Sequence, residues 1–388
     1  MNYQAGEQAK PERHYDIDWL RVLATLAVFL FHCARLFNYE DWHVKNNEQN
    51  LIMSVFVSFL VLWIMPILFF ISGEGSFLGL TIRSGGRYIG ERIKRLVIPF
   101  VGGTVVIIIP LQVYYERVQH SEFVGSFLDF YPHYFDGLYA LGGNFAWMGL
   151  HLWFLGYLFI ISALSLPLFL LIKKKAFKVK SFEFATIIKK PGAILLFAIP
   201  LIIIELIVNL QPTGIGSRVF GGWSLAQYLF FFTFGYLFAS DIALGELLVS
   251  NRKISLVAGL VASIFYISVS YYIMFKGHDF IPRYLEYFFR GVFRPSCSWF
   301  LLVAILGYGR KYLNFNNRIL KNANEAVLPF YILHQTVIVT LGFHLAAWNA
   351  GVTVKYLIVS TSAFIIIVSL YAVIRRFGWL RFLFGMKG

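Results

Sequence analysis

The chain has 388 residues, of which 58% are hydrophobic and only 14% are charged, and its mean hydropathy is +0.68. A soluble domain carries about a quarter charged residues, so this composition excludes an ordinary soluble protein. A formal net charge of +14 would suggest a nucleic-acid partner in a soluble protein. Here the basic residues lie in short segments between apolar runs, where they set membrane topology and contact anionic lipid headgroups. We therefore expect membrane lipid, and no nucleic acid, as a partner.

Apolar runs of membrane-spanning length recur along the whole chain. A spanning helix needs about 20 predominantly apolar residues, and by that criterion there are about ten spans. The expected spans are 19–38, 51–72, 96–115, 152–172, 192–210, 224–240, 253–274, 296–309, 326–347 and 355–374. The sequence thus predicts an all-α membrane protein forming one domain over 1–388. Its helical core is expected at about 15–375, between cytoplasmic tails at 1–14 and 376–388.

The basic residues predict the orientation independently. Alternate connections between spans are rich in lysine and arginine, namely 83–95, 173–190, 252–253 and 310–321. The other connections hold few basic residues apart from 275–295, whose bias is diluted by Asp279 and Glu286. Because cytoplasmic loops carry the excess of lysine and arginine, we expect an even number of spans with both termini in the cytoplasm. The expected location is the inner or plasma membrane.

The connection 116–150 is unusually rich in aromatic residues, glycine and histidine, as in "HSEFVGSFLDFYPHYFDGLYALGGNFAWMG". Two interpretations remain open for it. The segment could cover a site, or it could lie in the membrane interface as part of an aromatic belt.

Three isolated reactive groups lie within expected spans or beside them. Cys33 and Cys297 offer no metal-ligand or redox spacing, so we expect both to pack as small apolar residues and we expect no metal site. Glu205 is a lone carboxylate in the fifth span. It could join a polar cavity or remain protonated within the bundle.

Two ionisable side chains share the first span. Arg21 and His32 are eleven residues apart, which is close to three helical turns, so both lie on one stripe about 16 Å long. Asp18 lies one turn before Arg21 and can pair with it. Ionisable residues inside a membrane usually face a bundle interior or a wet cavity and are candidates for function. The alternatives are that Arg21 reaches the inner headgroups and that His32 is structural. A functional His32 could relay protons or act as a general base.

Five motifs follow one another along the chain. The first span, "YDIDWLRVLATLAVFLFHCARLF", carries an Arg-x10-His pattern at Arg21 and His32. The others are "MPILFFISGEGSF" (65–77), "RYIGERIKRLVIP" (87–99), "HLWFLGYLF" (151–159) and "FYILHQTVIV" (330–339). Together they resemble the acyltransferase 3 family of integral membrane acyltransferases. The glucan biosynthesis protein C subgroup is the most similar, through "DIDWLRVLA" and "DWHVKN" (41–46), although some relatives open with Asp-x-x-Arg instead of Asp-x-Asp-Trp.

The resemblance implies a reaction. Members of this family transfer an acyl group from cytoplasmic acyl-CoA, across or within the membrane, to a hydroxyl group of a glycan at the other face. By this resemblance His32 is the catalytic histidine, and Arg21, assisted by Asp18, serves the donor side. A sugar hydroxyl is a poor nucleophile at neutral pH, so a general base is needed, and histidine is the side chain most easily tuned for that task.

The resemblance also implies residues for the acyl donor. Guanidinium groups bind phosphate in a bidentate manner, so we expect the phosphates of acyl-CoA at Arg87, Arg92 and Arg95, with Ser72 nearby. The same arginines are also an ordinary topology signal, and Ser72–Gly73 would fit the end of the second span with glycine as its cap. The thioester carbonyl needs a hydrogen-bond donor as negative charge develops on its oxygen. The candidates for this donor or for acceptor contacts are Trp153, Tyr157, Tyr331 and His334.

The sequence is therefore interpreted as an O-acyltransferase that moves an acetyl or succinyl group, with acyl-CoA as co-substrate and no permanently bound cofactor. An oligomer is possible. Two other classes share some of these features. A proton-coupled transporter also has buried histidine and charge, and a glycan exporter or flippase would move the glycan without acyl chemistry. No paired halves with matching interrupted helices are visible, and this favours the enzyme.

Overall fold

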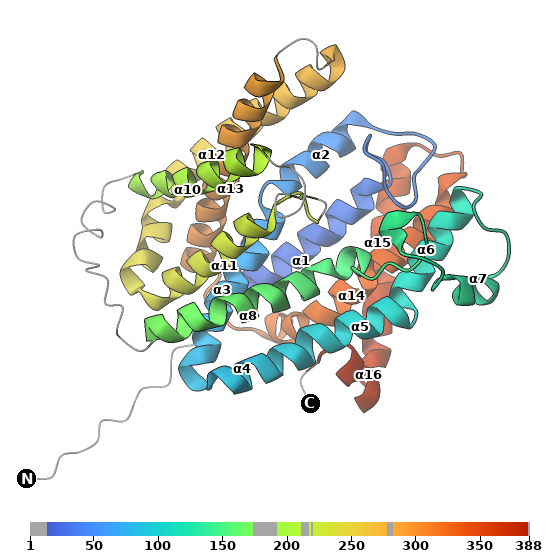
Figure 1. Cartoon of the computed structure of the whole chain (residues 1–388), viewed down its shortest axis with the longest axis horizontal. Coiled ribbons are helices and arrows are strands. Elements are labelled where there is room, and N and C mark those ends of the chain that lie inside the picture. The colour runs from blue at the N-terminus through green and yellow to red at the C-terminus, as the bar shows by residue number, and fades with distance from the viewer. Residues whose placement is uncertain (1–13, 174–191, 211–216, 219, 278–281, 387–388) are drawn as a thin grey trace, which may run out of the picture.

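The computed structural model describes residues 14–173, 192–210, 217–218, 220–277 and 282–386, and the regular elements in these ranges are all helical (Figure 1). The first eight α-helices are α1 (Tyr15–Arg35), α2 (Leu51–Val61), α3 (Ile64–Ile82), α4 (Gly85–Arg92), α5 (Ile98–Val105), α6 (Ile108–Gln119), α7 (Phe127–His133) and α8 (Trp153–Lys173). The others are α10 (Ala198–Leu210), α11 (Leu225–Ser240), α12 (Ile242–Lys276), α13 (Arg283–Tyr312), α14 (Arg318–Ala346), α15 (Val352–Ile374) and α16 (Gly378–Leu383).

The helices confirm the expected all-α membrane protein with about ten spans. Within the described residues, nine helical segments are long and apolar enough to cross a membrane, with α2 and α3 forming one segment and α4 to α6 another. The tenth, α11, is apolar but only 16 residues long. The orientation of the termini stays a prediction. The N-terminal tail and the lysines at 174–190 lie outside the described residues.

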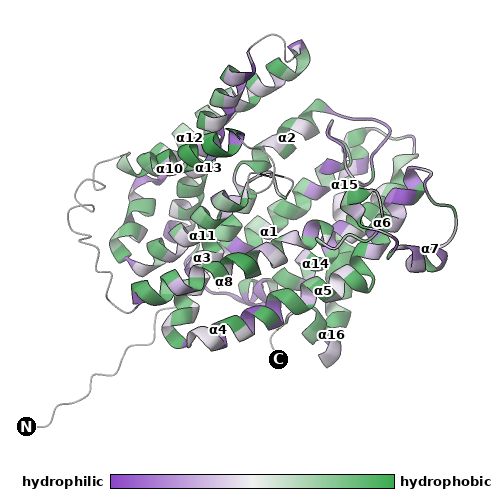
Figure 2. Cartoon of the chain, in the orientation of Figure 1, coloured by the Kyte–Doolittle hydropathy of each residue, from purple (hydrophilic) through white to green (hydrophobic). Residues whose placement is uncertain are grey.

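Hydropathy follows this arrangement in space. Figure 2 shows apolar residues along the long helices and hydrophilic residues gathered in the connection after α1 and around α7. Large apolar side chains on α12, such as Ile254, Val257, Val261 and Ile264, are exposed, as expected for a face that meets lipid. In contrast, 61% of the apolar window of α14 is buried, against 28% for α12 and for α15. Helix α14 therefore lies in the interior of the bundle, where it packs against α1, α6 and α15.

The region expected to be an outer connection at 275–295 is largely helical instead. Helix α13 begins at Arg283 and runs for 30 residues, so the short eighth span expected at 296–309 is only its second half. Glu286 and Arg290 form an ion pair of 2.8 Å one turn apart, and Phe289 stacks on Tyr266 of α12. These contacts let α12 and α13 continue as a hairpin that projects beyond the other helices (Figure 1).

The second motif does not end a helix, because α3 continues from Ile64 to Ile82. Gly73 lies inside α3 and serves close packing. A Cβ atom on Gly73 would stand 1.9 Å from the carbonyl oxygen of Phe232 in α11, and one on Gly235 would stand 1.9 Å from that of Phe70. The two helix backbones are thus in direct contact, which only glycine permits at these two positions.

Candidate active site

Three histidines from distant parts of the chain meet in the bundle. His32 lies near the end of α1, His334 in the middle of α14, and His151 in the turn that precedes α8. The Nε2 atom of His334 is 3.1 Å from Nδ1 of His32. The ring centroid of His334 lies 4.9 Å from that of His32 and 5.1 Å from that of His151. The three imidazoles therefore form one cluster with His334 at its centre.

Backbone carbonyls determine where the protons of His32 and His334 lie. Nδ1 of His334 is 2.5 Å from the carbonyl oxygen of Tyr331, which can only accept, so Nδ1 carries the proton and Nε2 is an acceptor. Nδ1 of His32 is 2.9 Å from the carbonyl oxygen of Val28 and therefore also carries its proton. That N–H is shared between Val28 and Nε2 of His334. In the neutral ring the lone pair of His32 is consequently on Nε2.

His151 has both ring nitrogens engaged. Its Nε2 donates to the carbonyl oxygen of Ile332 at 3.0 Å, and its Nδ1 accepts from the Gln112 amide at 3.1 Å. Gln112 is itself held by Thr336 at 2.8 Å and by Gln335 at 2.9 Å. Nε2 of His32, by comparison, makes no hydrogen bond to any residue in the described part of the chain. Of the three rings, His32 is thus the one with a nitrogen available to a ligand.

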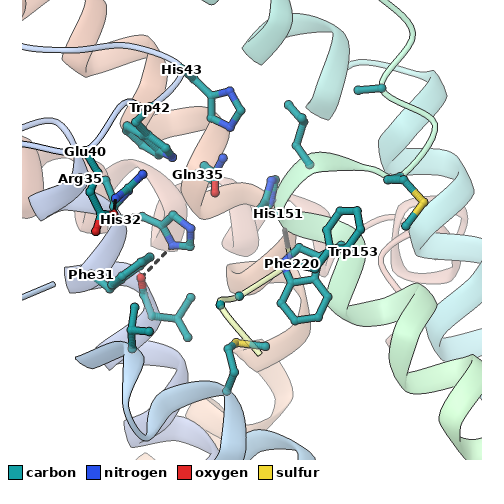
Figure 3. A pocket seen from close by; sticks show the side chains of 18 of the residues that line it. Phe31, His32, Arg35, Glu40, Trp42, His43, His151, Trp153, Phe220 and Gln335 are labelled. Carbon is teal, nitrogen blue, oxygen red and sulfur yellow. Dashed lines mark hydrogen bonds and ion pairs between the residues drawn. The ribbon is translucent and has the colours of Figure 1, made fainter. Parts of the chain in front are cut away.

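His32 lines a cavity of about 730 Å³. Figure 3 shows Phe31, His32 and Trp42 along one side of the cavity, with His151, Trp153 and Phe220 facing them. The lining comes from α1, the connection after it, the α2–α3 junction, residues 139–153, the segment before α11, and Gln335 of α14. It is mostly apolar and aromatic with a few polar groups, which is the usual character of a small-molecule site. The aromatic connection 116–150 contributes Tyr139 and Trp147, so part of it covers this site.

The four candidates for the oxyanion or acceptor contacts differ in position. Trp153 lines the cavity. Tyr157 packs edge-on against Trp153, with ring centroids 5.3 Å apart, outside the lining. The Tyr331 hydroxyl donates to the carbonyl oxygen of His151, and His334 lies behind His32. Only Trp153 among the four contributes to the cavity wall.

Arg21 lies three turns away from His32 on α1 and pairs with Asp18 as expected, at 3.1 Å. Its guanidinium also donates to the side-chain oxygen of Asn324 in α14 at 3.2 Å. The Arg21 side chain is 34% exposed, so it has open surface as well as these partners. Both ends of the α1 stripe therefore contact α14, through Asn324 at one end and His334 at the other.

The basic segment after α3 is held by Ser76. Arg92 donates to the Ser76 hydroxyl at 2.8 Å, and the Tyr88 hydroxyl donates to the same oxygen at 2.9 Å. Ser72, one turn earlier on α3, instead donates to the carbonyl oxygen of Leu68. The sequence interpretation missed Ser76, although its spacing of four from Ser72 places both on one face of a helix.

Arg87 and Arg95 are both exposed, and Arg95 lies in a π-helical turn over Ile93–Val97. Pro99 explains this turn, because proline has no N–H to donate to the carbonyl of Arg95 four residues earlier. Wide turns of this kind often mark functional positions in helices. The turn sets Arg95 on an exposed surface of the segment expected to bind the donor.

Glu205 is not a lone carboxylate. Its Oε1 lies 3.2 Å from a guanidinium nitrogen of Arg218 and 3.5 Å from one of Arg294, and its Oε2 accepts from Gln227. Arg294 also donates to the carbonyl oxygen of Gly222. This buried ion cluster therefore ties α10, α11 and α13 to a segment that lines the cavity.

The fold and the site define a multi-pass membrane protein with a histidine in an aromatic cavity. The acyltransferase domain family matches residues 14–372, and the chain belongs to this family. "Glucans biosynthesis protein C" of Escherichia coli (strain SMS-3-5 / SECEC) is 21% identical over 378 residues, covering 97% of this chain and 95% of that protein. The protein of the same name from Salmonella paratyphi B is 22% identical over 386 residues, with the same coverage. No solved structure matches the chain. The expected family and the expectation of an O-acyltransferase are confirmed.

Proposed function

We propose that the protein transfers an acyl group from acyl-CoA to a hydroxyl of a glycan, with His32 as the general base, in the inner or plasma membrane. The observation that carries this proposal is the environment of His32. Its Nδ1–H is held by Val28 and His334, and Nε2 is left without a partner among the described residues at the wall of the cavity. A glycan acceptor is supported by the names of the relatives.

The reaction follows from the positions of the protons. Nε2 of His32 takes the proton of the acceptor hydroxyl as its oxygen attacks the thioester carbonyl carbon. The C–S bond then breaks, and the CoA thiolate receives that proton from His32, which yields the ester and free CoA. During the intermediate stage His32 is an imidazolium, and its Nδ1–H points to two acceptors, Val28 and His334. Nε2 of His334 can accept this hydrogen bond because the proton of the His334 ring is on Nδ1, which donates to the carbonyl oxygen of Tyr331.

The remaining roles are assigned by position. Trp153 is the preferred oxyanion donor because, of the four candidates, it alone lines the cavity and its indole N–H is a donor. Arg92 and Arg95, with Arg87, are assigned to the phosphates of the donor, since guanidinium groups suit phosphate. Arg21 belongs to the same donor side. Acetyl-CoA and succinyl-CoA are both suitable donors.

Purified protein, labelled acetyl-CoA or succinyl-CoA, and the glycan fraction from cells that lack the gene provide the test. The wild-type protein should release CoA and label the glycan, and His32→Ala should lower transfer by about 1,000-fold or more, as expected when a general base is removed from its site. His344→Ala is the matched control, because His344 is an exposed histidine of α14 outside the cavity. Donor or glycan binding without thioester turnover would reject the proposal and favour a carrier.

A further inference from the structure

A third histidine lines the same cavity, besides His32 and His151, and is held by a carboxylate. His43 lies in the connection between α1 and α2, and its Nδ1 is 2.5 Å from Oε2 of Glu116 near the end of α6. The other oxygen of Glu116 accepts from the Tyr139 hydroxyl at 2.6 Å. His43 and Tyr139 are both part of the cavity lining, and Glu116 is buried behind them.

The carboxylate determines which atom of His43 is presented to a ligand. A carboxylate accepts, so Nδ1 of His43 carries a proton, and the ring is fixed in place by Glu116. Nε2 makes no hydrogen bond within the described ranges. The side chain is 16% exposed, against 8% for Glu116. His43 therefore offers the cavity one polar atom in a fixed position.

Trp42 stands between the two histidines that line this wall. Its ring centroid is 6.0 Å from that of His32 and 5.6 Å from that of His43 (Figure 3). A flat aromatic face beside two polar groups is suited to a ligand that has an apolar ring face and hydroxyls around its edge. A sugar ring has this character, and its neighbouring hydroxyls can reach two separate hydrogen-bonding partners.

We propose that Trp42, His43 and Glu116 form the acceptor-sugar subsite. The sugar ring stacks on Trp42, the reacting hydroxyl faces Nε2 of His32, and a neighbouring hydroxyl bonds to Nε2 of His43. In this arrangement His43 positions the acceptor and takes no part in the proton transfer, and Glu116 holds His43. The inference rests on the proposed function, because it assumes that the acceptor is a saccharide.

A purely structural role for His43 makes a different prediction. The His43–Glu116 contact also joins the α1–α2 connection to α6, and a fold contact of this kind would not affect one substrate selectively. Gln119 provides the comparison, because its side chain bonds to the backbone N–H and carbonyl of Lys45, both at 2.8 Å. It joins the same two segments without lining the cavity.

Three variants separate the two roles. His43→Asn keeps an N–H near the position of Nδ1 for Glu116 but removes Nε2, whereas His43→Gln places an amide near Nε2. We expect His43→Asn to raise the KM for the acceptor about ten-fold, the effect of one lost hydrogen bond, with the KM for acyl-CoA within about two-fold of the wild type. His43→Gln should recover part of the loss. Gln119→Ala should leave both constants near wild type.

The measurement uses the full-length protein, labelled acyl-CoA and the glycan fraction from cells that lack the gene. An unchanged acceptor KM in His43→Asn, or equal changes in both KM values, would overturn the acceptor subsite. A rise in acceptor KM for Gln119→Ala as large as that for His43→Asn would do the same. These outcomes differ from a failure of the proposed function, in which the wild-type protein itself transfers no acyl group or His32→Ala retains full activity.

Discussion

Nε2 of His334 lies 3.1 Å from Nδ1 of His32, although the two residues are 302 positions apart in the sequence. His334 is buried, and its other nitrogen donates to the carbonyl of Tyr331. His334 is thus an uncharged acceptor for the N–H of His32. His334 occupies the position that the aspartate has in a Ser-His-Asp triad, where it accepts from Nδ1–H of the catalytic histidine. Unlike an aspartate, a neutral histidine adds no negative charge to the interior of the bundle. The proposed base is therefore oriented from two helices, by the carbonyl of Val28 in its own helix α1 and by His334 in α14.

The first prediction concerns this contact. His334→Ala should lower kcat about 10- to 100-fold with little change in either KM, because His334 acts through His32 and touches no substrate. Steady-state kinetics on the purified protein provide the measurement. In the double variant His32→Ala/His334→Ala the loss should be no larger than in His32→Ala alone. Additive losses would show that His334 acts independently of His32.

The second prediction concerns the acyl donor. Arg92→Ala should raise the KM for acyl-CoA about ten-fold and leave the acceptor KM unchanged, because one charge-assisted contact to phosphate is lost. Ser76→Ala should give a smaller change in the same direction, since Ser76 orients Arg92 and carries no charge itself. Lys253→Ala is the control, because it removes an exposed positive charge from helix α12, outside the basic segment that follows α3. An equal effect of Arg92→Ala and Lys253→Ala would indicate a general charge effect.

The third prediction tests the contact between α3 and α11. Gly235→Ala should destabilise the protein by about 2 kcal/mol or more, because the added methyl group would meet the carbonyl oxygen of Phe70 and force the backbones apart. Gly86→Ala on α4, where a Cβ meets nothing within 4 Å, should be close to neutral. Thermal unfolding in detergent measures both. Equal melting temperatures for the two variants would contradict the close packing.

The fourth prediction concerns the ion cluster beside the cavity. Glu205→Ala should destabilise the protein by about 2–4 kcal/mol, because it leaves two largely buried guanidinium groups without their carboxylate. Glu286→Ala is the control, since its partner Arg290 is 38% exposed and can be solvated by water. Thermal unfolding of the two variants provides the comparison. A loss for Glu205→Ala no greater than for Glu286→Ala would show that the cluster is not a structural support.

Several elements could be predicted from local sequence, and others could not. Continuous apolar runs were sufficient to predict most of the membrane spans, because a spanning helix is recognised by the length and polarity of its own residues. The same criterion predicted only the second half of α13 as a span, because Arg290 and Arg294 interrupt the apolar run in its first half. Those charges are tolerated because Glu286 and Glu205 pair with them, and Glu205 lies on another helix. A hydropathy average is taken over consecutive residues and therefore does not include ion-pair partners on other helices.

The sequence by itself determined the membrane class, the helices, the family motifs and the common stripe of Arg21 and His32, because each depends on composition or on the period of a single helix. The tertiary structure decided which histidines of the cavity keep a ring nitrogen without a hydrogen bond in the described residues, and it brought His43 to Glu116 and His32 to His334. The physical reason is that these contacts join segments 73 and 302 residues apart. They exist only once particular helices have packed against one another, and no pattern within one helix encodes that choice.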